Sequence, residues 1–176
     1  MSAAVLFACQ KSSYYQIPGL DIYDIERDAR TFDGGFPVIA HPPCRAWGRL
    51  RQFAKPRPGE KELGLFAAVM VRRWGGVLEH PAYSSLWAAA GLPRPGQGFD
   101  SAGGWSLSVN QFWWGHRAEK ETWLYIRGVR PDGIPPIPLC FDLVPTTVER
   151  MDRREREKTP LDFCRWLVDL VGRVQL

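Results

Sequence analysis

The run Val38-Ile39-Ala40-His41-Pro42-Pro43-Cys44 constrains the fold more than any other stretch of the chain. Three small or branched apolar residues lead directly into a histidine and two prolines. Proline cannot donate to a sheet ladder and restricts the residue before it, so the run is typical of a buried strand that leaves its sheet. Cys44 is therefore predicted to lie on a loop at the carboxyl end of a strand, which is where ligands bind in open α/β sheets.

Length and composition favour one domain. A chain of 176 residues, 45% of them hydrophobic, can bury a substantial core, so we expect a single domain over residues 1–176. The four cysteines form no CxxC pair, which argues against a disulfide framework or a zinc ribbon and favours a reducing cytoplasm. The first eight residues lack a basic segment, and no stretch approaches the roughly 18 apolar residues of a membrane span. We expect a soluble protein that is neither exported nor bound to a membrane.

A strand, a helix and a second strand are predicted over residues 38–78. Apolar residues recur at helical spacing over residues 60–74 and stop at Gly75-Gly76, as in an amphipathic helix. Val77-Leu78 is then a short strand, which the chain leaves through Glu79-His80-Pro81. Strands joined by a crossover helix are parallel, so Cys44 and Glu79 should emerge side by side at one edge of the sheet. With an apolar strand at residues 3–9, this predicts an α/β fold: a compact, Rossmann-like, mostly parallel sheet flanked by helices.

The second predicted strand, residues 20–24, ends near two acidic side chains. Asp24 or Glu26 would lie where a carboxylate commonly binds a ribose, although residues 25–30 are equally typical of an exposed charged turn. The preceding loop has no glycine before Gly19, so the glycine-rich phosphate loop of nucleotide-binding folds is missing.

Two further strands, residues 105–109 and 121–126, flank a glycine-containing loop and predict a hairpin. Residues 91–104 are predicted to be a flexible loop, residues 131–138 irregular, and residues 149–158 a solvated run of charges. Thr159 as the cap and Pro160 at the first position predict a last helix with an apolar buried face.

Basic and aromatic residues gather around these motifs. The net charge of +4 is compatible with a polyanionic partner without requiring one. Residues 45–59 carry five cations and predict a mobile loop that contacts phosphates, with a merely solvated loop as the alternative. Tryptophan is unusually frequent, and the tryptophans near the motifs serve either core packing or base stacking. They are Trp47, Trp105, Trp113, Trp114 and Trp123.

In this order the motifs resemble cytosine-C5 DNA methyltransferases, and more specifically the small methyltransferase-like proteins of phages and prophages. The resemblance is carried by Pro43-Cys44, Glu79 before a nearby proline, Gln111 with Arg117, and the residues 24–30 (DIERDAR), 41–44 (HPPC), 115–125 (GHRAEKETWLY) and 156–160 (REKTP). It implies DNA or a pyrimidine nucleotide as substrate, S-adenosylmethionine as methyl donor, and the cytoplasm of a bacterial host. Little sequence between residues 129 and 156 is left for a separate target-recognition domain.

The resemblance also implies roles for individual residues. Cys44 would attack C6 of the base, Glu79 would hold N3, and Arg117 would steady the base or the intermediate. Asp24 and Glu26 would bind the cofactor. The substrate would be contacted by nearby polar and aromatic side chains, namely His41, Arg45, Trp47, His80, Gln111, His116 and Lys120.

Two other kinds of function remain open from the sequence. His41, Cys44, His80 and His116 could converge on one metal in a metal-dependent modifying enzyme, since imidazole and thiolate are ligands for zinc and iron. The chain could instead be a non-catalytic protein that keeps the fold and binds nucleic acid or a host protein. In that case Cys44 could be a buried, inert cysteine.

Overall fold

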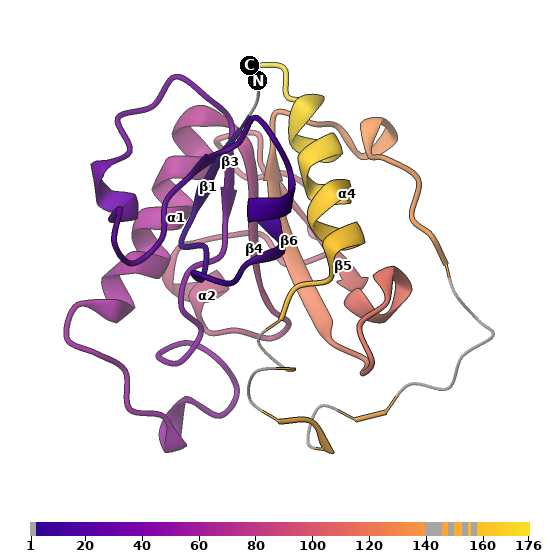
Figure 1. Cartoon of the computed structure of the whole chain (residues 1–176). Helices are drawn as coiled ribbons and strands as arrows, with labels where there is room; N and C mark the ends of the chain where they lie inside the picture. The colour runs from indigo at the N-terminus through magenta and orange to yellow at the C-terminus, as the bar shows by residue number, and fades with distance from the viewer. Residues whose placement is uncertain (1–2, 140–145, 148–149, 153–154, 156–157) are drawn as a thin grey trace.

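A computed structural model describes residues 3–139, 146–147, 150–152, 155 and 158–176 (Figure 1). Parts of the expected charge run, at residues 149, 153–154 and 156–157, lie outside the described residues. The strands are β1 (Ala4–Leu6), β2 (Asp21–Ile22), β3 (Val38–Ala40), β4 (Gly76–Pro81), β5 (Trp105–Asn110) and β6 (Glu121–Arg127). The α-helices are α1 (Glu60–Trp74), α2 (Leu86–Ala89) and α4 (Leu161–Gly172). The 3₁₀ turns are η1 (Ser13–Gln16), η2 (Ala29–Thr31), η3 (Arg51–Phe53), η4 (Gln111–Trp114) and η5 (Pro131–Gly133).

The strands form one six-stranded sheet in the order β2-β1-β3-β4-β6-β5. Strands β2, β1, β3 and β4 are parallel, whereas β6 is antiparallel to both of its neighbours, β4 and β5. The protein is thus an α/β fold with a mixed sheet, and the expectation of a mostly parallel sheet is confirmed only for its first four strands. The reason is the short connection between β5 and β6, because a short loop can only reverse the chain, while a parallel pair needs a long crossover.

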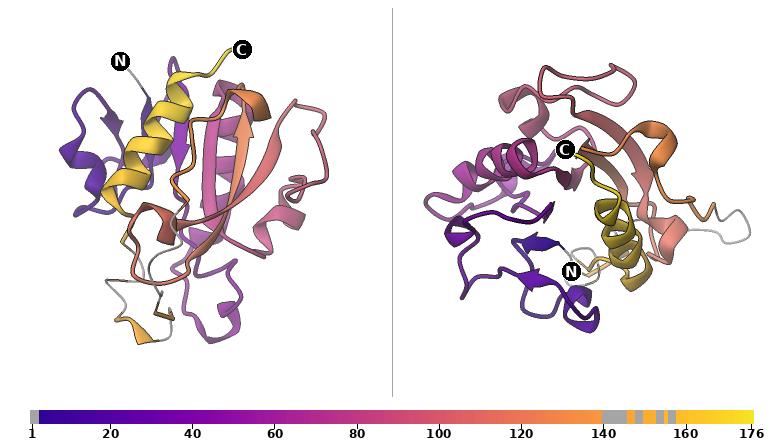
Figure 2. Two further views of the ribbon diagram at one scale, coloured as in Figure 1. Left: turned by 90° about the vertical axis from the view of Figure 1, so that its right-hand side faces the viewer. Right: turned by 90° about the horizontal axis from the view of Figure 1, so that it is seen from above.

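Helices cover both faces of the sheet (Figure 2). One core lies under α1 and α2, and a second core lies under α4 and η1. In both, the strands contribute alternate residues, as the two-residue period of a strand requires. Most of the tryptophans near the motifs belong to these cores: Trp47, Trp105, Trp114 and Trp123 are all less than a tenth exposed, and Trp113 is partly buried. This confirms the core-packing interpretation for those four.

The predicted strand–helix–strand unit is confirmed. Helix α1 spans the expected residues and ends at Gly75, which has φ 71°, and its amide donates to the carbonyl of Val71. The next residue, Gly76, has φ 112°, and a Cβ there would lie only 2.0 Å from the Val38 carbonyl oxygen. Glycine is thus required where β4 starts beside β3. The carboxyl ends of β3 and β4 therefore lie at the same edge.

Four local expectations need correction. Strand β4 runs on to Pro81, so Glu79 and His80 belong to the strand and not to a loop after it. The last helix begins at Leu161 and has no side-chain cap; the Thr159 carbonyl instead accepts a bond from the Ser13 hydroxyl. A 3₁₀ turn occupies the start of the segment expected to be irregular. The loop expected to be flexible, residues 91–104, is fastened by Asp100, whose carboxylate pairs with Arg72 at 2.8 Å.

No α-helix within the described ranges is long and apolar enough to cross a bilayer.

Candidate active site

Glu79 and His80 are consecutive on β4 and face opposite sides of the sheet. Val77 belongs to the core under α4 and Leu78 to the core under α1, so the alternation sends Glu79 to the α4 side and His80 to the α1 side. The His80 ring lies 6.4 Å from the ring of Trp87, which belongs to the α1-side core. His80 therefore points to the opposite side of the sheet from Glu79, whose carboxylate is bonded to His41.

On the α4 side, Glu79 is the centre of a buried hydrogen-bond network. Its Oε2 lies 2.8 Å from Nδ1 of His41, the residue that follows β3. Its Oε1 accepts a 2.9 Å bond from Nε2 of Gln111, and this nitrogen also donates to Thr122 Oγ1 at 3.0 Å. The Tyr14 hydroxyl lies 2.8 Å from Nε2 of His41. The loops after β1, β3 and β5 and the start of β6 thus meet at the end of β4.

The charges in this network follow from its burial. Desolvation alone would raise the pKa of Glu79, but the hydrogen bond from His41 and the positive charge of Lys120 outweigh it and lower that pKa to about 2. Burial raises the pKa of Tyr14 well above its usual value, and burial also raises the pKa of the neighbouring Cys164 thiol to about 12. At neutral pH Glu79 is thus an anion and Tyr14 a phenol. A carboxylate anion can only accept, so Nδ1–H of His41 donates to Glu79.

Several buried polar atoms have no hydrogen-bond partner within the described part of the chain. They are both ring nitrogens of His80, Oε1 of Gln111 and Nε2 of His116. Burial lowers the pKa of His80 to about 4, against the weaker opposing effects of the Glu79 charge and the Pro43 carbonyl. His80 is therefore neutral at pH 7.

Cys44 is exposed on the turn that follows β3. The Cys44 carbonyl accepts bonds from the amides of Trp47 and Gly48, and the Trp47 indole donates to the Lys61 carbonyl at 3.1 Å. The Trp47 carbonyl in turn accepts bonds from the Ser85 amide and hydroxyl, both at 3.0 Å. The turn that carries Cys44 is thus bonded to the start of α1 and to the segment after β4. The alternative that Cys44 is buried is wrong.

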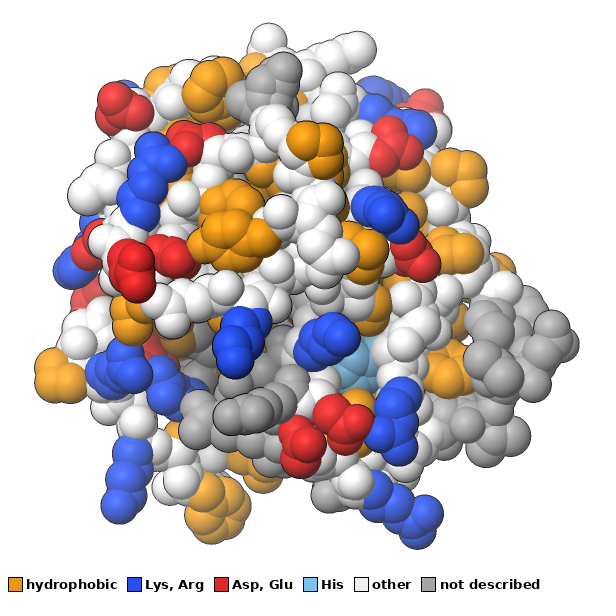
Figure 3. All heavy atoms as spheres, viewed as in Figure 1, with side chains coloured by type: hydrophobic (Ala, Val, Ile, Leu, Met, Phe, Trp, Pro, Cys, Tyr) orange, Lys and Arg blue, Asp and Glu red, His pale blue; other side chains and the backbone are white. Residues whose placement is uncertain are grey.

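Arg45 does not extend into solvent toward a substrate. Its guanidinium makes two hydrogen bonds, of 2.8 and 2.7 Å, with the buried carboxylate of Glu60 at the start of α1. Glu60 also accepts a bond from the amide of Arg57, so one carboxylate holds both ends of the basic loop. The cations between those ends are exposed: Arg49, Arg51 and Lys55. Figure 3 shows Lys and Arg side chains over the lower part of the face seen in Figure 1, where this loop lies.

The hairpin loop places its predicted residues in different settings. Arg117 is 68% exposed and pairs with Glu155 at 2.5 Å. His116 is buried, and its Nδ1 contacts the backbone of Ala118. Lys120 is partly buried, and its charge reaches Glu79. Gln111 is the residue of this loop that hydrogen-bonds directly to Glu79.

The two acidic residues near the end of β2 are occupied by local contacts. Asp24 Oδ1 accepts the amides of Glu26 and Arg27, and Oδ2 accepts the Tyr15 hydroxyl at 2.8 Å. Glu26 is exposed and accepts a 2.8 Å bond from Gln10. Asp24 therefore shapes the turn, as an acidic residue often does through its own following amides.

Among the described residues, no group of three or more His, Cys, Asp or Glu side chains is arranged to hold a metal ion. This agrees with the separation of His41 from His80 by the sheet.

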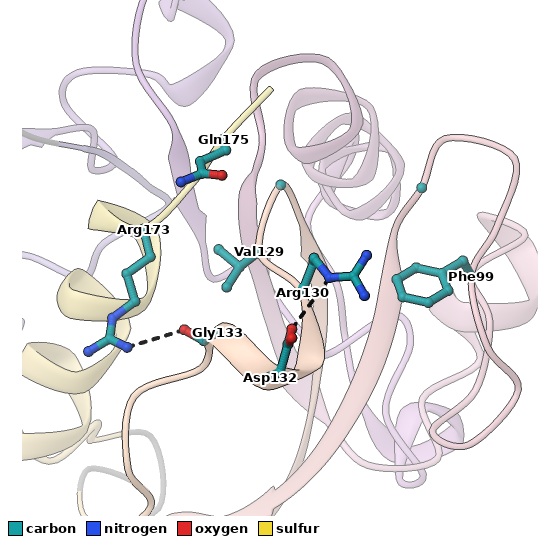
Figure 4. A pocket seen from close by; sticks show the side chains of 9 residues that line it. Phe99, Val129, Arg130, Asp132, Gly133, Arg173 and Gln175 are labelled. Atoms are coloured by element: carbon teal, nitrogen blue, oxygen red, sulfur yellow. Dashed lines mark hydrogen bonds and ion pairs between the residues drawn. The ribbon is translucent and has the colours of Figure 1, made fainter.

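Two surface depressions lie away from the network. One, of about 460 Å³, is lined by Phe99, Val129, Arg130 and Arg173 among others, at the end of β6 and the end of α4 (Figure 4). The second, of about 330 Å³, runs along β5 beside residues 95–99. The first depression lies at the other end of the strands from the Glu79 network, so neither Cys44 nor Glu79 lines it.

Sequence reasoning missed Tyr14, Thr122 and Cys164. Thr122 and Cys164 lie in a strand and a helix where their small side chains resemble ordinary core positions. Tyr14 lies in a loop with no apolar periodicity. The only usable signal was that the loop after a first parallel strand approaches the carboxyl ends of its neighbours.

A comparison with models of known protein families, with curated proteins and with solved structures finds no match to this chain.

Proposed function

We propose that the protein modifies a pyrimidine base in DNA or in a nucleotide, with Cys44 as the nucleophile. The observation that carries this proposal is the buried, ionised Glu79 bonded to His41, three residues before an exposed cysteine at the carboxyl edge of parallel strands. Glu79 and the Tyr14 hydroxyl occupy both ring nitrogens of His41, so this buried network fixes the start of the loop that carries Cys44. The alternative kind of protein, one that only binds, needs no such pair.

The chemistry requires a thiolate and a group that handles the charge on the base. Addition of a thiolate to C6 of a pyrimidine makes C5 nucleophilic. Once C5 has bonded to the new group, a base removes the C5 proton, the C6–S bond breaks and the ring is restored. The resemblance assigns Glu79 to N3 of the base, but both oxygens of Glu79 already accept bonds within the chain. A base at Glu79 would have to displace Gln111 or His41. We therefore assign Glu79 first to orienting His41.

The specific reaction implied by the resemblance is transfer of a methyl group to cytosine C5 from S-adenosylmethionine. The residues expected to bind this cofactor do not fit it well, because three internal donors occupy Asp24 and the loop after β1 has no glycine before Gly19.

The strand order supports a ligand crevice of the Rossmann-like kind. From β1 the chain passes first to β2 on one side and then to β3 on the other side. In doubly wound folds such a reversal opens a crevice at the carboxyl ends of the strands, and ligands bind there. The loops after β1 and β3, with Tyr14 and His41, lie at this point. A bacterial cytoplasm is the compartment that this proposal implies.

The direct test is nucleoside mass spectrometry on DNA, and on the free nucleotide pool, from cells that express the wild-type chain, Cys44→Ser or Cys9→Ser. Cys9 is also exposed and serves as the matched control. We expect a modified pyrimidine with the wild type and Cys9→Ser, and none with Cys44→Ser. A gain of one methyl group on cytosine would identify methyl transfer, and a different mass would identify a different donor.

A second candidate, non-catalytic nucleic-acid binding, is favoured by the exposed cations of the basic loop. If no pyrimidine changes mass in either pool while the chain still binds DNA, this second function replaces the first.

A further inference from the structure

Tyr83, two residues after β4, has an unusual backbone conformation. Its φ is 61°, and Phe7 is the other non-glycine residue with positive φ in the described part of the chain. This left-handed region is unfavourable for residues with a Cβ and is normally filled by glycine or asparagine. Nevertheless, Tyr83 is 58% exposed, so burial of its ring does not explain the choice of residue. Strain of this kind is concentrated at ligand-binding positions.

The Tyr83 ring is supported from behind. It lies 5.0 Å from the ring of Trp123, which in turn contacts Trp87 edge-on at 5.6 Å. A ring that packs against Trp123, which is itself held by Trp87, keeps one orientation while much of its surface faces solvent. Such a ring loses little conformational freedom when a flat ligand stacks on it.

Tyr83 belongs to the same part of the carboxyl edge as Cys44. The residues after it, Ser84 and Ser85, donate to the carbonyl of Trp47, at the end of the turn that starts at Cys44. Arg49, the next cation along the basic loop, is exposed and follows Trp47 by two residues. An exposed aromatic ring and a cation on two segments that are bonded together match the two parts of a nucleotide, a flat base and a phosphate.

We propose that Tyr83 is a stacking platform for an unpaired base next to the base that Cys44 attacks, so that the substrate is a polynucleotide strand and not a free nucleotide. The identity of the attacked base rests on the proposed function above. The stacking itself does not, because every nucleobase offers a π face. Arg49 would contact the phosphate between the two bases.

The test is binding of a fluorescein-labelled single-stranded DNA dodecamer of alternating cytosine and thymine, followed by fluorescence anisotropy. Loss of a base–aromatic stack weakens binding substantially, so we expect Tyr83→Gly to raise the Kd about tenfold and Tyr83→Phe to leave it within about twofold. Tyr83→Gly should not lower the Tm, because glycine removes the unfavourable φ. Tyr83→Asn, which also tolerates this φ, should behave as Tyr83→Gly does.

Phe7→Gly is the matched control. It relieves the same kind of strain at a ring that packs against Phe66, and it should leave the Kd unchanged. The proposal is overturned if Tyr83→Gly binds as tightly as the wild type, if the wild type does not bind the strand, or if dCTP competes as well as the unlabelled strand. It is also overturned if Tyr83→Gly and Tyr83→Asn lose binding and Tm together, since the ring would then be structural.

The two proposals fail separately. Cys44→Ser should bind the strand as the wild type does, because the thiol takes no part in stacking. Binding that depends on Tyr83 without any Cys44-dependent product would refute the chemistry and support the platform. A Cys44-dependent product with a Kd insensitive to Tyr83 would support the chemistry and refute the platform.

Discussion

Glu79 and His80 are adjacent in the sequence and both buried, yet their surroundings on the two sides of β4 differ. Glu79 has a partner on each carboxylate oxygen, and it keeps its charge. Neither ring nitrogen of His80 has a hydrogen-bond partner among the described residues, and burial keeps the ring neutral. On the α4 side of β4, hydrogen-bond partners stabilise a buried charge, whereas on the α1 side the buried residue is surrounded by aromatic rings. A histidine on this strand is no evidence for chemistry until its face is known.

The largest expected effect is on the α4 side. Glu79→Ala would leave Nδ1–H of His41 and one of the two N–H groups of the Gln111 amide without a buried acceptor, so the free energy of unfolding should fall by about 3 kcal/mol. Urea unfolding at neutral pH measures this. Glu119→Ala, an exposed carboxylate in the hairpin loop, is the control and should change stability little. A loss below about 1 kcal/mol for Glu79→Ala would mean that the network contributes little to stability.

The two faces should also respond to acid in different pH ranges. The folded pKa of His80 is depressed, so the unfolded chain takes up this proton first, and stability falls as the pH drops from about 6.5 to about 4. This difference in pKa corresponds to roughly 3 kcal/mol at its limit. The folded pKa of Glu79 is also depressed, so its stabilisation is complete above about pH 4.5 and is lost as the pH falls toward 2.

His80→Leu separates these two ranges. It should remove the loss between about pH 6.5 and 4 and leave the loss at lower pH in place. Urea titrations of the wild type and of the variant across this range provide the measurement. If both lose stability equally above about pH 4.5, His80 is not the group responsible.

The smallest expected effect is at Arg117. Its pair with Glu155 is largely exposed, so Arg117→Ala should cost less than about 0.5 kcal/mol of stability. Nucleoside mass spectrometry with this variant then tests the role that the resemblance gives to Arg117. A full yield of product from Arg117→Ala would remove Arg117 from the reaction.

The sequence predicted the parts of the fold that depend on local signals. Helix α1 has clear periodicity and a glycine stop, and the parallel pairing of β3 with β4 follows from the crossover rule. The same rule placed Cys44 and Glu79 at one edge. The end of β4 was misjudged because Pro81 was taken as a signal that the strand had already ended. That error placed His80 in a loop.

The partners of the site residues could not be predicted, because they depend on contacts between distant segments. Nothing local in the sequence pairs Arg45 with Glu60, or Tyr14 with His41. Charged residues in a loop were interpreted as available for a ligand, and the structure shows that Arg45 is already occupied. Residue type and spacing predict the position of a side chain in the fold, whereas its hydrogen-bond and ion-pair partners depend on how distant segments pack.

The contacts of Glu60 with Arg45 and Arg57 reduce the conformational freedom of the basic loop, residues 45–59. A loop tied at its base has already lost, during folding, the freedom that its two ends would otherwise have. A polyanion that binds the exposed cations therefore restricts the loop less than it would restrict an untethered segment of equal length. Loss of the Glu60 contacts would make the basic loop more flexible without removing any of the exposed charges between its ends.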